Sequence, residues 1–101
     1  MSTKSQLVGH WRYTDDFQSC DCVFLEDGTF TGNITRGKKV ISGFTGRWSL
    51  DNDVLTYTYA NDVFNLIQPG YKDCDALVEI SEDYYVIKPI VDKERKYLRV
   101  R

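Results

Sequence analysis

The chain has 101 residues, a formal net charge of −2, and 42% hydrophobic and 28% charged residues. This composition argues against a disordered chain, and the length allows one hydrophobic core, so we expect a single domain over residues 1–101. The net charge argues against a dedicated nucleic-acid-binding protein, and no apolar run is long enough to cross a bilayer. An aromatic content of 14%, with seven tyrosines, favours β structure.

The N-terminal segment predicts a short helical turn over residues 3–7, followed by a strand. The first residues lack the apolar stretch of a secretory signal, so we expect a cytoplasmic protein. Residues 8–14 alternate in polarity, which places Trp11 on a face that meets the core. His10 and Arg12 then face outwards, and we interpret His10 as a surface residue.

The next segment predicts a β-hairpin. Residues 19–26 form one arm, with Cys20, Cys22 and Phe24 on one face, and residues 29–35 form the other. Asp27-Gly28 lies between them, and this dipeptide is typical of tight hairpin turns because glycine readily adopts positive φ angles.

A second hairpin over residues 44–59 organises the middle of the chain. Its arms alternate in polarity on both sides of Asp51-Asn52-Asp53, a cluster of turn-forming residues. Gly46-x-Trp48 repeats the earlier Gly9-x-Trp11, which indicates a meander of hairpins around two tryptophans. Glycines within the strand over residues 40–50 indicate a bulge or bend that lets a small sheet curl towards closure.

The C-terminal part changes its pattern once. Residues 61–68 favour a helical turn ended by Pro69-Gly70, with a short strand as the alternative. Residues 84–90 and 97–101 predict strands, and Pro89 indicates a free edge or bulge because proline cannot donate a ladder hydrogen bond. Residues 75–81 predict a strand that carries three apolar residues on one side, namely Ala76, Val78 and Ile80.

The sequence thus predicts an all-β fold, either a small up-and-down antiparallel barrel or a strongly curled sheet of about eight strands. A short helical turn near residues 61–68 completes this prediction.

The three cysteines cannot all pair within one chain, which agrees with a reducing compartment. Cys20, Cys22, Cys74 and the one histidine, His10, supply enough ligands for a zinc site. We favour structural thiols and no metal, since Cys-x-Cys along a strand is not the spacing of a turn-held ligand pair.

The acidic residues cluster at predicted turns, including Asp73 with Asp75, and turn formation explains them without catalysis. No nucleotide-binding loop or Ser-His-Asp arrangement is present, so an enzyme is the less favoured interpretation, and no cofactor is expected. Residues 88–101 hold six basic and two acidic residues, and we expect some of these bases to face acidic loops of the same molecule.

Several short motifs resemble those of short bacterial lipocalin-like domains. They are Leu-Val-Gly-His-Trp at residues 7–11, Phe-Leu-Glu-Asp-Gly-Thr-Phe at residues 24–30, Gly46-Arg47-Trp48 followed by residues 53–55, and Tyr97-Leu98-Arg99. The resemblance implies a ligand-binding barrel in which Arg99 packs over the Trp11 ring as a cation–π contact. The sequence differs from the secreted lipocalins in its expected lack of a signal peptide, its lack of paired cysteines and its short length, which argues against transport of lipophiles.

We therefore expect a non-enzymatic binding protein that holds a small apolar or amphipathic molecule within the barrel, with no nucleic-acid or membrane partner. The alternatives are an interior packed with side chains and a protein-interaction module, such as a homodimer, that pairs through an exposed strand edge. The expected ligand-binding residues are Trp11, Phe24, Phe30, Trp48, Tyr57, Tyr59 and Arg99.

Overall fold

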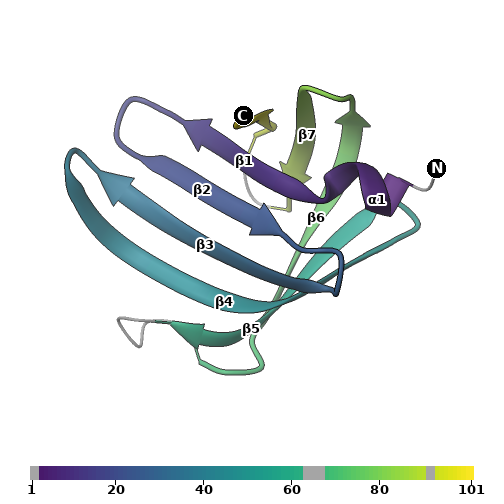
Figure 1. The fold of residues 1–101 in the computed structure, drawn as a ribbon, viewed down its shortest axis with the longest axis horizontal. Coiled ribbons are helices and arrows are strands. Elements are labelled where there is room, and N and C mark those ends of the chain that lie inside the picture. Colours follow the sequence, from purple (N-terminus) through teal and green to yellow (C-terminus); the bar gives the residue numbers. More distant parts are fainter. Residues whose placement is uncertain (1–2, 63–67, 91–92) are drawn as a thin grey trace.

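Eight antiparallel strands form a closed barrel, with one short helix at the N-terminal end (Figure 1). This computed structural model describes residues 3–62, 68–90 and 93–101. The elements are α1 Thr3–Leu7, β1 Gly9–Thr14, β2 Ser19–Phe24, β3 Thr29–Arg36, β4 Lys39–Asp51, β5 Val54–Asp62, β6 Lys72–Ile80, β7 Tyr84–Pro89 and β8 Arg95–Arg99. Each strand pairs with its neighbours in sequence, and β8 closes on β1, which confirms the predicted up-and-down barrel.

The turn between β4 and β5 and the bulge in β4 lie where the sequence predicts them. Asn52 and Asp53 have φ angles of 50° and 63°, so both central residues of the β4–β5 turn are left-handed, as a type I′ hairpin turn requires. At Gly46 the β4–β5 register shifts, and the Thr58 carbonyl oxygen occupies the space that a Cβ atom would need. The predicted bulge within residues 40–50 is therefore confirmed at this glycine.

The structure corrects two expectations in the C-terminal half, and a third lies largely outside the described residues. Residues 61 and 62 end β5, whereas residues 63–67 of the predicted helical turn lie outside the described residues. Asp73 and Asp75 lie within β6, not in a turn. The three apolar residues expected on one side of β6 do not share a face, because a bulge between Leu77 and Glu79 shifts the register.

The barrel is closed at β7 as well. This strand pairs with β6 as far as Pro89, but its pairing with β8 stops at Ile87, which lies opposite Arg95. The end of β7 at Pro89 therefore has a free edge on the side of β8, as expected for a residue that cannot donate a ladder hydrogen bond. A homodimer stays a prediction.

Helix α1 covers the end of the barrel where the β2–β3 and β4–β5 turns lie (Figure 1). Leu7 is fully buried, and its carbonyl oxygen accepts a hydrogen bond of 2.8 Å from the Trp11 indole N–H. The Lys4 ammonium lies 5.4 Å from the centre of the Trp48 ring. Within the described part of the chain, no helix is long and apolar enough to span a membrane.

Aromatic side chains fill the half of the barrel next to α1. Trp11 meets Tyr85 edge to face at 4.9 Å, and Phe24 lies 5.0 Å from Trp48. Tyr85 also stacks on Tyr97, with ring centres 4.9 Å apart. Both tryptophans are buried, as the alternation predicts, and this half of the interior is a packed core.

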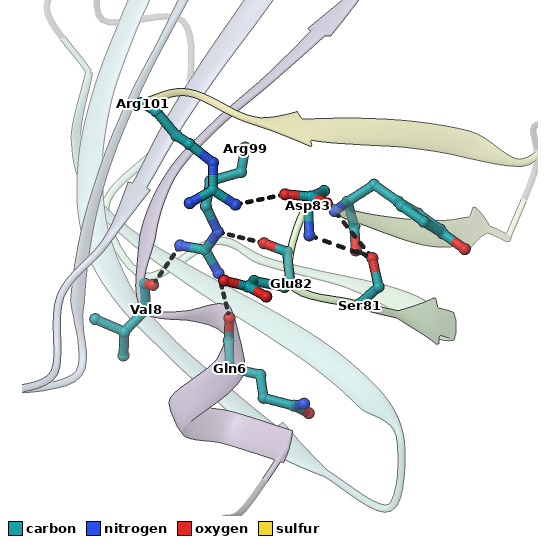
Figure 2. Close-up of polar contacts among 8 residues, drawn as sticks. Gln6, Val8, Ser81, Glu82, Asp83, Arg99 and Arg101 are labelled. Carbon is teal, nitrogen blue, oxygen red and sulfur yellow. Dashed lines mark hydrogen bonds and ion pairs between the residues drawn. The ribbon is translucent and has the colours of Figure 1, made fainter.

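Arg99 ties the last strand to α1 and to the β6–β7 turn (Figure 2). Its guanidinium lies 4.1 Å from the centre of the Trp11 ring, as the family resemblance implied. It also donates hydrogen bonds to three carbonyl oxygens, those of Gln6, Val8 and Glu82. Nearby, Arg101 pairs with Asp83 in the β6–β7 turn, so part of the basic C-terminal segment faces an acidic loop of the same molecule.

Candidate functional site

A cavity of about 220 Å³ lies in the half of the barrel farther from α1. Its lining includes Tyr59 near the end of β5, Asp73 near the start of β6 and Arg95 at the start of β8, which places it at the opposite end from the helix. The other lining residues are Cys20, Cys22, Phe30, Ile34, Ser42, Phe44, Tyr57, Asp75 and Tyr97.

Four aromatic rings form one wall of this cavity. Phe44 meets Tyr59 edge to face at 5.4 Å, and Phe30 meets Tyr59 and Tyr57 in the same way at 5.7 and 5.5 Å. Edge-to-face contacts fix ring orientation and add to the energy of burial. The wall is therefore largely apolar, and its rings hold one another in place. The two tyrosines add hydroxyl groups to it.

Asp75 supplies a buried carboxyl group to the same cavity. Strand β6 places it between Leu55 of β5 and Pro89 of β7, and its side chain is on the inner face, with the residue only 9% exposed. Among the described residues, no side chain or backbone group is hydrogen-bonded or ion-paired to this carboxyl group. Burial, and next the nearby Asp73 carboxylate, raise the pKa of Asp75 to about 6, while Arg95 partly opposes them.

Arg95 is the basic residue of the lining, and it is half-buried. Its guanidinium carbon lies 5.7 Å from the centre of the Tyr13 ring on β1. Within the described structure no ion pair joins it to Asp75. The described lining residues therefore include two carboxyl groups and one guanidinium, and the Asp75 carboxyl group is the most deeply buried of the three.

Cys20 and Cys22 lie side by side on the inner face of β2, with sulfur atoms 3.9 Å apart. The Tyr97 hydroxyl group donates to the Cys20 sulfur at 3.9 Å. The hydrogen bond with Cys22 lowers the pKa of Cys20, whereas the same contact and burial raise the pKa of Cys22. As predicted, both thiols share one face with Phe24.

The four residues considered for zinc do not converge. Cys74 lies on the outer face of β6, where its sulfur is 3.5 Å from the Thr56 hydroxyl oxygen. His10 lies on the outside of β1 and contacts the Asp21 carboxylate at 2.8 Å, in agreement with its predicted surface position. Across residues 3–62, 68–90 and 93–101, no three histidine, cysteine or acidic residues are grouped as metal ligands.

The structure divides the seven expected ligand-binding residues into two sets. Phe30, Tyr57 and Tyr59 line the cavity. The remaining residues belong to the packed half or to its cap, and these are Trp11, Phe24, Trp48 and Arg99. Sequence reasoning missed the charged part of the lining, above all Asp75, because it assigned the acidic residues of this segment to a turn.

Comparisons with known proteins bear on the fold. No protein-family model matches this sequence, and no curated protein matches it significantly. Among solved structures, a lipocalin-like protein from Bacteroides uniformis ATCC 8492 superposes with a TM-score of 0.68 at 15% sequence identity, over 94% of this chain and 99% of that protein. The barrel described above therefore has the fold of a lipocalin-like protein.

Proposed function

We propose that this protein binds a small amphipathic molecule in the cavity at the end of the barrel opposite α1. An eight-stranded barrel is wide enough either to fill itself with side chains or to hold one small ligand. Here the two outcomes are divided along the barrel axis, since aromatic rings fill the half next to the helix while the other half retains a cavity of about 220 Å³. That cavity is the observation that carries the proposal.

The size of the cavity limits the ligand. Drug-sized ligands occupy pockets of roughly 300–1,000 Å³, and an apolar cavity of about 150 Å³ holds a benzene molecule. A cavity of about 220 Å³ suits a single ring or a short alkyl chain with one polar group. The aromatic wall would contact the apolar part, and Asp75 together with the tyrosine hydroxyl groups would contact the polar part.

The test is a screen of small aromatic and short-chain compounds by NMR, with binding read from chemical-shift changes of residues that line the cavity. Ser42 is buried on the inner face of β4, and Ser49 is exposed on the same strand. Ser42→Phe fills the cavity and should abolish binding, whereas Ser49→Phe makes the same change outside the barrel and should leave binding unchanged. If no compound binds, or if the Ser42 variant binds as well as the wild type, the proposal is wrong.

A further inference from the structure

We propose that the ligand is a small organic ammonium ion, whose charged nitrogen is held by the Asp75 carboxylate and whose apolar part lies against the aromatic wall. This inference rests on the proposed function and names the chemical class of the ligand. It combines three observations on the same cavity. These are a buried carboxyl group that no described residue pairs with, a cluster of aromatic rings, and a guanidinium that lies against an aromatic ring of β1.

The carboxyl group of Asp75 is the first observation. It is nine-tenths buried, faces the cavity, and has no hydrogen-bond or ion-pair partner among the described residues. Buried charges in proteins are normally paired, because removing a charge from water is costly unless another charge or a set of hydrogen bonds replaces the solvent. An ammonium group can take the place of the solvent, because it carries a positive charge and donates hydrogen bonds to the carboxylate.

The aromatic wall is the second observation. Phe30, Phe44 and Tyr59 contact one another at 5.4 to 6.0 Å, all within the lining of the cavity. The faces of such rings attract organic cations, and aromatic clusters beside a carboxylate suit ammonium groups that carry apolar substituents. A neutral amphipathic ligand would use the rings and leave the carboxylate unpaired, whereas an anion would be repelled by it.

The position of Arg95 is the third observation, because this residue is the obvious competitor for Asp75. Its guanidinium lies by the Tyr13 ring, and the described structure contains no ion pair between it and Asp75. Asp73 adds a second carboxylate on the same strand, two residues nearer the end of the barrel. A cation that enters the cavity therefore meets two carboxylates on β6, while the guanidinium of Arg95 lies against the Tyr13 ring of β1.

Binding should weaken as the pH falls, because protonation of Asp75 removes the charge that the cation needs. The pKa of about 6 places this loss in an accessible range. Burial raises the pKa of Tyr57, Tyr59 and Tyr97, so these groups stay neutral there. The titratable or charged groups that share the cavity with Asp75 are Asp73 on β6, Arg95 and Tyr97 on β8, Tyr57 and Tyr59 on β5, and Cys20 and Cys22 on β2.

The test compares three compounds of nearly equal shape, namely phenethylamine, phenethyl alcohol and phenylacetate, by NMR titration at about pH 7.5. We expect phenethylamine to bind about tenfold or more tightly than phenethyl alcohol, and phenylacetate to bind most weakly. Equal or tighter binding of the alcohol overturns the inference while the proposed function stands. Failure of all three, together with failure of the wider compound screen, overturns both.

Two isosteric variants identify the carboxylate. Asp75→Asn should lower the affinity for phenethylamine to that for phenethyl alcohol and leave the affinity for the alcohol within about twofold. Its binding should also be constant from about pH 7.5 to about pH 5, where the wild type loses affinity for the amine. Asp73→Asn, at an exposed position of the same strand, should have a smaller effect. If the Asp75 variant still prefers the amine, the inference is wrong, whatever its stability.

Discussion

Replacing Asp75 by asparagine should stabilise the protein at neutral pH. The folded barrel buries this carboxyl group, and none of the described residues pairs with it, so its ionised form is less favourable there than in the unfolded chain. Asparagine has nearly the same shape and carries no charge. The variant should therefore keep the fold and remove an unfavourable contribution to the free energy of folding.

The magnitude follows from the pKa. Folding raises the pKa of Asp75 from 3.8 to about 6, and each pKa unit corresponds to about 1.4 kcal/mol, which gives an upper value of about 3 kcal/mol. Because the folded state binds the proton more tightly, the wild type gains stability as the pH falls from about 6 towards 3.8. The advantage of the variant should be largest above about pH 6.5 and should vanish near pH 4.

Urea denaturation at several pH values measures this difference. Trp11 and Trp48 are both buried, so their fluorescence reports unfolding directly. At about pH 7.5 we expect the variant to be more stable by about 1–3 kcal/mol, with a melting temperature about 5–15 °C higher. Asp73→Asn is the comparison variant: the residue is exposed, and its charge raises the pKa of Asp75 less than burial does, so the gain in stability should be clearly smaller. A variant that is less stable than the wild type at pH 7.5, or an advantage that does not change with pH, would refute the reasoning.

Three further predictions concern other parts of the barrel. Arg99→Ala should lower the free energy of unfolding by about 2–4 kcal/mol, because it removes three hydrogen bonds and a cation–π contact, and a loss below about 0.5 kcal/mol in urea denaturation would contradict this. Gly46→Ala should lower the free energy of unfolding by about 2 kcal/mol or more, since the added Cβ atom would overlap a carbonyl oxygen of β5. An unchanged melting temperature would contradict this and show that the bulge can move. Iodoacetamide should alkylate Cys20 faster than Cys22, because the pKa of Cys20 is lowered and that of Cys22 is raised; equal rates in peptide mass spectrometry would contradict this order.

The packed half of the barrel could be predicted from the sequence because its signals are local. The alternation of apolar and polar residues around Trp11 and Trp48 predicts which side chains face inwards. Asp27-Gly28 and Asp51-Asn52-Asp53 predict where the chain turns. The placement of Arg99 over Trp11 could be expected from a resemblance, although the two residues are far apart in the chain.

The cavity could not be predicted in the same way, because it depends on register between distant strands. The bulge between Leu77 and Glu79 shifts the register of β6, so the three apolar residues expected on one side are separated: Ala76 and Val78 are exposed, whereas Ile80 packs against the core. Leu77 and Asp75 are the residues of this segment that face the barrel interior. No pattern within one strand distinguishes an acidic residue at a turn from one that faces a barrel interior.

The Asp75 carboxylate, which has no partner among the described residues, connects the stability of this barrel to the cation binding proposed above. A ligand that supplies a positive charge to Asp75 relieves the same unfavourable interaction that the asparagine variant removes, and the energy recovered appears as affinity. About 3 kcal/mol corresponds to roughly a hundredfold in the dissociation constant, which is a large part of what a ligand of this size can gain. The variant that folds best should therefore be the variant that binds a cation worst. Replacing a residue that served only the fold should instead lower the stability and the affinity together.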